Sequence, residues 1–166
     1  LRGVTLDVMA GEVTLIVGPS GCGKSTLLSI LSGLQPGDSG RMHAMGEDLA
    51  ALDRKALERF RLHNLGFVFQ AFNLFPALTA WEQVALPLSH LGLSAHQARE
   101  RACQALEAVG LSSRLEQLPA ALSGGEKQRV AIARAVAKRA RPLCAHEPPR
   151  PLGAHSGQGV GGILRR

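Results

Sequence analysis

A glycine-rich stretch near the start of the chain has the residues and the spacing that bind phosphate. Gly18 and Gly23 enclose four residues, and Lys24 and Ser25 follow at once, which matches the pattern G-x-x-x-x-G-K-[ST] in full. Glycines let the backbone bend until successive N–H groups point at phosphate oxygens. The Lys24 ammonium would neutralise the β- and γ-phosphates of a nucleotide, and the Ser25 hydroxyl would bind Mg²⁺. The stretch therefore predicts a site for a nucleoside triphosphate with Mg²⁺.

Two elements must hold this loop in place. Residues 13–17 form a short apolar run rich in β-branched side chains, which is typical of a strand buried on both faces of a parallel sheet. Residues 25–33 predict a helix that points its positive N-terminus at the phosphates and ends at Gly33. The expected core face of this helix consists of five apolar side chains: Leu27, Leu28, Ile30, Leu31 and Leu34.

A second stretch, about a hundred residues later, predicts another helix that binds an anion at its N-terminus. Ser123 is a good N-cap, and Gly124 and Gly125 would let a phosphate approach the backbone closely. The helix that follows has an apolar face composed of Val130, Ile132, Ala133, Val136 and Ala137.

The segments between these two sites alternate in the manner of an α/β protein. Residues 41–49 resemble a strand and a turn, residues 53–64 an amphipathic helix, and residues 65–70 an apolar strand that ends in Gln70. A further helix is expected from the cap Ser94 to the stop Gly110. Its apolar stripe consists of Ala98, Ala102, Ala105, Leu106 and Val109.

The combination of these motifs resembles the ATP-binding subunit of ABC transporters over nearly the whole chain. Residues 18–26 match the Walker A motif, Gln70 the Q-loop and residues 122–126, LSGGE, the signature motif. The segment FVFQAFNLFPALTAWEQVALPL is most similar to the subfamily of lipoprotein-release and MacB-type exporters. The resemblance implies the α/β fold of a P-loop NTPase, with a mostly parallel central sheet, an N-terminal antiparallel β portion and a helical subdomain. We expect residues 1–166 to form a single domain, with this subdomain inserted at about residues 76–125. The P-loop strand and the strand before His146, residues 142–145, are expected to be neighbours in the mostly parallel core.

The resemblance also implies ATP and Mg²⁺ as cofactors and a role for specific residues. Ser25 and Gln70 are the expected metal ligands, and Glu147 is the expected catalytic residue. The expected nucleotide contacts are Gly18, Pro19, Ser20, Gly21, Cys22, Gly23, Lys24, Ser25, Thr26, Gln70, Ser123, Gly124 and Gly125.

The chain departs from the family pattern after residue 141. His146 stands where the family has the Walker B Asp, Pro149 where it has Thr and Gly153 where it has a second loop Asp, whereas Glu147 and Pro148 are kept. Because Mg²⁺ prefers hard oxygen ligands, His146 is expected to weaken hydrolysis more than nucleotide binding. We expect the chain to be a piece of a longer protein, with a sheet that is incomplete at its C-terminal end.

The composition shows no sign of nucleic-acid binding, of a cysteine framework or of a membrane-spanning helix. The net charge is +6, and residues 126–166 carry 9 basic and 2 acidic side chains, but aromatic residues are few and no nucleic-acid motif is present. Three distant cysteines form no metal or disulfide pattern. No run reaches the ~18 apolar residues that cross a bilayer.

In the family, a second ABC subunit, identical or paired, completes each ATP site, and a separate transmembrane permease is the other partner. The expected location is therefore the cytoplasmic face of the cell membrane, with no nucleic acid as a ligand. Two alternatives are a soluble ABC-type ATPase that acts on nucleic acid or ribosomes and a degenerate ATPase that only binds nucleotide.

Overall fold

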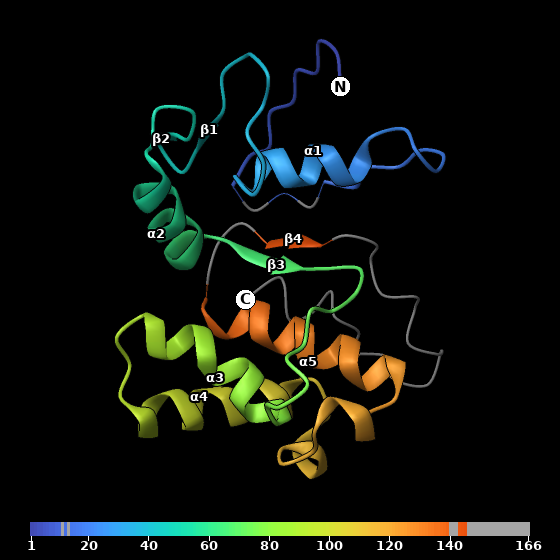
Figure 1. The fold of residues 1–166 in the computed structure, drawn as a ribbon, viewed down its shortest axis with the longest axis vertical. Helices are drawn as coiled ribbons and strands as arrows, with labels where there is room; N and C mark the ends of the chain where they lie inside the picture. The colour runs from blue at the N-terminus through green and yellow to red at the C-terminus, as the bar shows by residue number, and fades with distance from the viewer. Residues whose placement is uncertain (11, 13, 140–142, 146–166) are drawn as a thin grey trace.

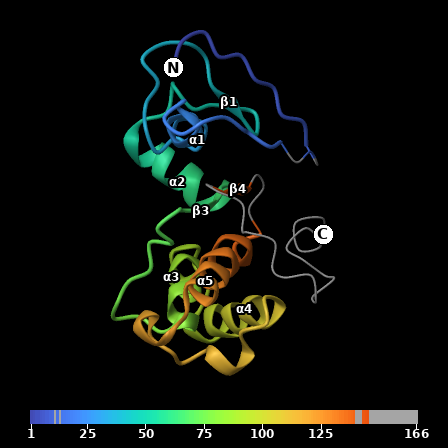
Figure 2. The ribbon, with the colours of Figure 1, turned by 90° about the vertical axis from the view of Figure 1, so that its right-hand side faces the viewer.

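A parallel pair of strands lies between helices on its two sides. The computed structural model describes the whole chain except residues 11, 13, 140–142 and 146–166. Strand β3 (Gly66–Val68) pairs with β4 (Leu143–Ala145) in parallel register, Gly66 opposite Leu143 and Val68 opposite Ala145. Helix α1 (Lys24–Leu31) lies on one side of this pair and α5 (Gly124–Ala137) on the other (Figures 1 and 2). The predicted strands before Gln70 and before His146 are thus confirmed in position, and the arrangement is that of an α/β protein.

The prediction of a buried strand at residues 13–17 is wrong for the four of these residues that the structure describes. Residues 14–17 have no strand conformation, and the side chains of Leu15 and Val17 are 67% and 77% exposed. A central parallel strand exists only when neighbouring strands satisfy its N–H and C=O groups. No described strand pair includes a residue of this run, and the strand before His146 pairs with β3 instead of the expected neighbour.

The expected core face of the first helix is only half-buried, at Leu27, Leu28, Ile30 and Leu31. No residue of α1 is fully buried, and Leu34 beyond its end is 45% exposed. The helix does end as predicted: Gly33 has φ of +63°, its N–H donates to the Ile30 carbonyl at 2.8 Å, and the Leu34 N–H donates to the Ser29 carbonyl at 2.8 Å. This is the Schellman geometry, which satisfies the last carbonyls of a helix.

An antiparallel hairpin and a charged helix follow α1. Strands β1 (His43–Ala44) and β2 (Glu47–Asp48) pair around a turn at Met45 and Gly46. Helix α2 (Arg54–Asn64) begins at Asp53, whose carboxylate accepts from the Ala56 N–H at 2.7 Å. A small core that includes Leu49, Phe60 and Leu65 joins the hairpin to this helix.

A helical lobe fills the lower part of Figure 1. It consists of α3 (Ala80–His90), α4 (Ala95–Ala108), η1 (Ser112–Arg114), η2 (Pro119–Ala121) and one face of α5. The predicted caps Ser94 and Ser123 both form capping boxes, with Gln97 and Glu126 respectively. Of the stripe expected on α4, Ala98, Ala102 and Leu106 are buried and the remaining two positions are partly buried. The boundaries 76–125 of an inserted subdomain stay a prediction.

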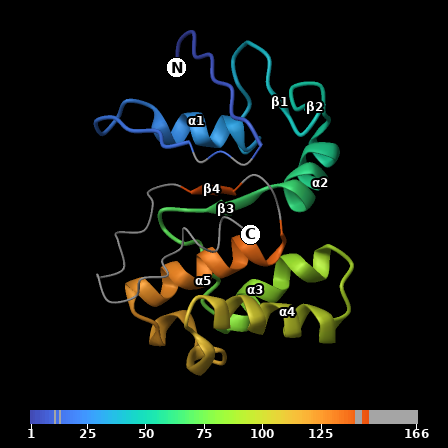
Figure 3. The same ribbon diagram turned by 180° about the vertical axis from the view of Figure 1, so that it is seen from behind.

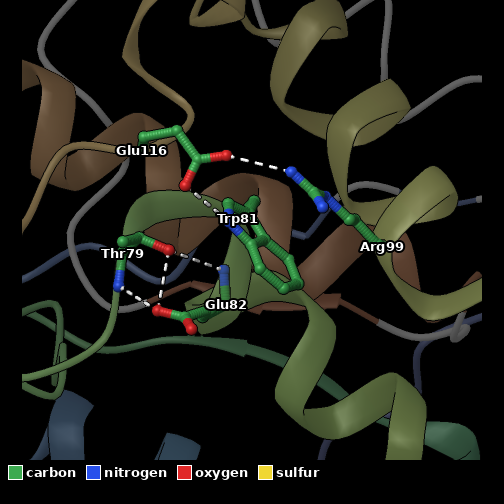
Figure 4. A network of polar contacts seen from close by, with 5 residues as sticks. All are labelled: Thr79, Trp81, Glu82, Arg99 and Glu116. Carbon is green, nitrogen blue, oxygen red and sulfur yellow. Dashed lines mark hydrogen bonds and ion pairs between the residues drawn. The ribbon is translucent and has the colours of Figure 1, made fainter. Parts of the chain in front are cut away.

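The start of α3 is fixed to the rest of the lobe by a polar network (Figure 4). Thr79 and Glu82 form a third capping box, in which the Thr79 N–H donates to the Glu82 carboxylate at 2.7 Å. The indole N–H of Trp81, the second residue of α3, donates to the Glu116 carboxylate at 3.1 Å. The Arg99 guanidinium binds the same carboxylate at 3.1 Å and lies 4.8 Å from the Trp81 ring centroid.

Candidate nucleotide site

The glycine-rich loop before α1 has a backbone that only glycine adopts easily. Gly23 is the N-cap of α1 with φ of +95°, and a Cβ added there would lie 2.7 Å from a methyl carbon of Leu1. A Cβ at Gly18 would lie 2.8 Å from the Cys22 sulfur. The loop therefore turns tightly without side chains in the way, as the phosphate-binding pattern predicts.

The Lys24 ammonium folds back onto this loop. Its Nζ donates to the carbonyl oxygens of Gly18 at 2.8 Å and Pro19 at 2.7 Å, and to the Cys22 sulfur at 3.7 Å. The positive charge and the N-terminus of α1 thus act at the same place. An anion that entered the loop would replace two neutral carbonyls as the partner of the ammonium, which is a stronger kind of hydrogen bond.

The two predicted metal ligands line one groove. Ser25 on α1 and Gln70 after β3 both border a groove of about 260 Å³, together with Ser29, Phe67, Phe69, Ala71 and Asn73. The fold therefore brings together two residues that are distant in the sequence. A larger hollow of about 360 Å³ lies by the opposite end of α1, bordered by Ser32 and Leu34 among others, and touches none of the predicted site residues.

The donor set in the groove suits a metal that arrives with a phosphate ligand. A serine hydroxyl and an amide oxygen are hard ligands of the type Mg²⁺ prefers, but they carry no charge. The described residues contain no cluster of three His, Cys, Asp or Glu side chains that could hold a metal by themselves. Mg²⁺ bound here would thus need phosphate oxygens to complete its ligands, as is usual for Mg²⁺ with nucleotides.

Two residues that the sequence analysis did not select shape the segment after Gln70. Arg134 of α5 donates to the carbonyl oxygens of Phe72 at 2.6 Å and Asn73 at 2.7 Å. Gln83 of α3 is 1% exposed; its amide donates to the carbonyls of Phe75 and Leu78 and accepts from the Phe75 N–H. No local pattern marks Arg134, which lies 61 and 62 residues from its partners, whereas the partners of Gln83 lie only five and eight residues away.

The second predicted anion site is an exposed helix N-terminus with a rigid cap. The Ser123 N–H donates to the Glu126 carboxylate at 2.8 Å, and the Glu126 N–H donates to the Ser123 hydroxyl at 3.3 Å. Arg114 also donates to this carboxylate, at 2.9 Å. The hydrogen bonds from Ser123, with a smaller effect of Arg114, lower the pKa of Glu126 to about 2.

Gly124 and Gly125 leave the surface of this helix end open. A Cβ at Gly124 would meet nothing within 4 Å, and at Gly125 it would meet only the end of Arg129 at 4.0 Å. Neither glycine has a positive φ. Packing within the described chain therefore does not demand glycine here.

The structure does not bring the two predicted phosphate sites together within one chain. The loop end of α1 and the N-terminal end of α5 face the same side of the molecule, but α1 and α5 lie on opposite sides of β3 (Figures 1 and 3). The expected catalytic Glu147, and the variant His146, lie outside the described residues.

Sequence and structure comparisons identify the class of protein. The family model described as ABC transporter matches residues 1–150. The chain also superposes on the ATP-binding cassette MJ0796, solved as a dimer in a post-hydrolysis state bound to ADP and Pi, with a TM-score of 0.89 and 38% identity. That match covers 96% of this chain and 70% of the other. The chain therefore belongs to the ABC transporter family and has the P-loop NTPase fold of an ABC cassette.

Two similar curated proteins are named as macrolide exporters. The macrolide export ATP-binding/permease protein MacB of Shigella boydii serotype 4 (strain Sb227) is 45% identical over 166 residues, and that of Escherichia coli (strain K12) is 44% identical. In both cases the match includes all of this chain and 26% of the relative. The chain thus spans about a quarter of the length of these relatives. None of its described helices combines the length and apolar composition needed to cross a membrane.

Proposed function

We propose that this chain is an ATP-binding and ATP-hydrolysing domain that drives transport through a membrane permease. The observation that carries the proposal is the single groove bordered by Ser25 and Gln70, with Ser25 directly after a loop whose carbonyls bind the Lys24 ammonium. A nucleotide with Mg²⁺ needs this combination of a backbone cradle, a fixed cation and two oxygen ligands. Membership of the ABC transporter family supports the same assignment.

In the proposed site each residue has a separate role. The loop N–H groups and the N-terminus of α1 bind phosphate oxygens, and Lys24 neutralises the β- and γ-phosphates. Ser25 and Gln70 orient the metal by their oxygen atoms. Bound Mg²⁺ would supply charge for the phosphoryl group that is transferred, and Glu147 would orient the attacking water.

A second subunit is the proposed partner for the signature motif. The open glycines at the start of α5 have no partner in the described chain, and the solved MJ0796 cassettes are dimers. Two chains facing head to tail would set the loop of one chain against Ser123, Gly124 and Gly125 of the other. The permease, by analogy with the fused ATP-binding/permease relatives, would hold the domain at the cytoplasmic face of the membrane.

The finer architecture belongs to the same proposal. The parallel β3–β4 pair supports a mostly parallel central sheet, and the β1–β2 hairpin supports an antiparallel portion at the N-terminal side. The similarity to MJ0796 over 96% of the chain favours both assignments.

A second candidate function is nucleotide binding without turnover. It is favoured by the replacement of the Walker B Asp by His146, because an imidazole is a poorer ligand for Mg²⁺ than a carboxylate. A loss of several kcal/mol of metal stabilisation would slow turnover by roughly 10²–10⁴.

Steady-state phosphate release with ATP and Mg²⁺ tests the proposal and separates it from the second candidate. We expect the unaltered chain to release phosphate slowly and Lys24→Ala to abolish the release. His146→Asp is expected to improve Mg²⁺-dependent ATP binding more than turnover. Zero turnover with intact ATP binding would favour the binding-only candidate, and turnover that survives Lys24→Ala would exclude this loop as the site.

A further inference from the structure

The turn that carries Gln70 has an unfavourable backbone. Phe72 has φ of +61° and Asn73 has φ of +46°, so two successive residues with side chains occupy the left-handed region. Asn tolerates this conformation, but Phe does so rarely, because its Cβ crowds the following carbonyl. Such a turn persists only where its surroundings fix it.

Arg134 is the side chain that fixes it. Its two terminal nitrogens donate to the carbonyls of the two left-handed residues, at 2.6 and 2.7 Å. The planar guanidinium fork fits two adjacent carbonyls at once, whereas an ammonium group is a point donor. Asn73 and Gln70 border the same groove as Ser25, so the turn held by Arg134 is a wall of the candidate nucleotide site.

The helix that carries Arg134 begins at the other candidate anion site. Arg134 lies in the third turn of α5, whose N-cap is Ser123. On this helix the buried Ala131, Ile132 and Ala135 pack with Val68 of β3, so α5 and the strand before Gln70 form one packed unit.

We propose that Arg134 is a positioning residue that holds the Gln70 turn opposite Ser25 and mechanically links it to the helix of the signature motif. The proposal rests on the proposed function of the groove as an ATP and Mg²⁺ site. Arg134 itself touches neither nucleotide nor metal; it acts through the backbone of residues 72 and 73. If a phosphate bound at the N-terminus of α5 and shifted this helix, Arg134 would therefore displace Gln70 as well.

Lys138 provides a matched control on the same helix. It lies one turn after Arg134, is also half-buried, and also donates to backbone carbonyls, those of Arg61, Leu62 and Leu65. Its partners belong to the last turn of α2 and its C-cap Leu65 rather than to the Gln70 turn. Arg134→Met and Lys138→Met each keep an aliphatic stem and remove the charge and its donors, so they differ chiefly in the carbonyls that lose a partner.

Hydrogen exchange of the full chain without ligand tests the first half of the proposal. The Phe72 N–H donates to the Phe69 carbonyl at 3.0 Å and the Asn73 N–H to the Ala71 carbonyl at 2.7 Å, so both amides report on the turn. We expect Arg134→Met to speed their exchange by roughly tenfold or more, which is the loss of hydrogen bonds from a charged donor. Lys138→Met should leave these amides within about twofold of the unaltered chain. Equal acceleration by both variants, or none by Arg134→Met, would overturn the proposal.

ATP binding, measured once with MgCl₂ and once with EDTA, tests the second half. Arg134→Met should reduce the gain in affinity that Mg²⁺ gives by about tenfold and leave the affinity in EDTA unchanged, since the loop and Lys24 are intact. For Arg134→Lys we expect a gain from Mg²⁺ between those of Arg134→Met and the unaltered chain. Lys138→Met should retain the full gain. In a Gln70→Ala background Arg134→Met should cause no further loss, because it acts through Gln70. The proposal would be contradicted if the affinity losses of Gln70→Ala and Arg134→Met simply added in the double variant. It would also be contradicted if Arg134→Met kept the full gain in ATP affinity from Mg²⁺.

The two experiments separate this inference from the proposed function. If the unaltered chain binds no ATP, the proposed function and the link to Gln70 both fail. In that case exchange at Phe72 and Asn73 still decides whether Arg134 holds the turn. Circular dichroism of Arg134→Met and Arg134→Lys shows whether a variant is folded, and the conservative variant keeps the test decisive if the Met variant unfolds.

Discussion

At the scale of single residues, the fold explains some glycines of this chain and leaves others unexplained. Gly33 has a positive φ, ends α1 and lies where a Cβ would be 2.8 Å from the Leu57 side chain, so the fold itself requires it. Gly124 has an ordinary φ and open space around it, so the fold does not. A glycine that packing does not need is best explained by a close approach from outside the described chain.

Replacing Gly33 should therefore destabilise the protein. We expect Gly33→Ala to lower the free energy of unfolding by about 1–2 kcal/mol, because a left-handed residue with a Cβ is unfavourable. Urea denaturation provides the measurement. Gly37→Ala is the control, since a Cβ there would make only ordinary contacts at 3.7 Å; it should change stability by less than about 0.5 kcal/mol. Equal effects of the two substitutions would contradict the account.

Glu126 should make stability depend on pH in the acid range. Its folded-state pKa is lowered to about 2, so the unfolded chain takes up the proton first as the pH falls. The contribution of the carboxylate is therefore fully present above about pH 4.5 and is lost as the pH falls towards about 2. Glu126→Gln keeps an acceptor for the Ser123 N–H but cannot titrate. The difference in unfolding free energy between the two chains should shrink over this window, and a constant difference would refute the assignment.

At the scale of elements, α5 is the helix that joins the lobe to the sheet. Val130, Ala133 and Ala137 pack into the core with α3 and α4, whereas Ala131 and Ala135 face Val68 of β3. Small side chains on both faces let neighbouring elements approach closely. The start of the signature motif and the turn at Gln70 consequently belong to one packed body.

A larger side chain on a buried face of α5 should lower the free energy of unfolding more than the same substitution on an exposed helix face. We expect Ala133→Leu, at a site 0% exposed, to lower the free energy of unfolding by about 1–3 kcal/mol. Ala108→Leu, at the exposed end of α4, should have little effect. Urea titrations of both variants give the comparison, and a neutral Ala133→Leu would mean that the helices are less tightly packed than they are in this structure.

The elements also show where sequence reasoning succeeds and where it fails. Asp53, Ser94 and Ser123 were predictable starts of helices because a cap depends on atoms three residues away. The strand expected at residues 13–17 depends on neighbours that are distant in the sequence, and the described chain does not supply them to residues 14–17. Arg134 and Gln83 were missed for a related reason: their partners are backbone groups, which no residue type reveals.

At the scale of the whole molecule, the two candidate phosphate sites face one side but lie across the sheet from each other. A single chain therefore offers two half-sites on one surface (Figures 1 and 3). A second copy turned head to tail would complete both of them at once, as a two-fold interface does. In the proposed dimer, Ser123, Gly124 and Gly125 would contact a nucleotide held by the partner.

Gly124→Asp should separate nucleotide binding from assembly. An Asp at the start of a helix favours folding by about 0.3–1 kcal/mol, yet it would repel a partner's phosphates. We expect this variant to bind ATP normally but not to dimerise with it. Mixing it with Lys24→Ala should restore some dimer, because one of the two interfaces then has an intact loop and an intact signature. Size-exclusion chromatography with light scattering measures this, and no recovery in the mixture would contradict a head-to-tail partner.

Equilibrium binding of ATP with Mg²⁺ to the full chain, compared with Lys24→Ala, tests the central claim most directly. Lys55→Ala, which removes an exposed lysine of α2, is the matched control. Loss of a charged hydrogen-bond donor predicts an affinity roughly 10- to 100-fold weaker for Lys24→Ala and unchanged for Lys55→Ala. If the two variants bind ATP as tightly as the unaltered chain, the glycine-rich loop is not the nucleotide site.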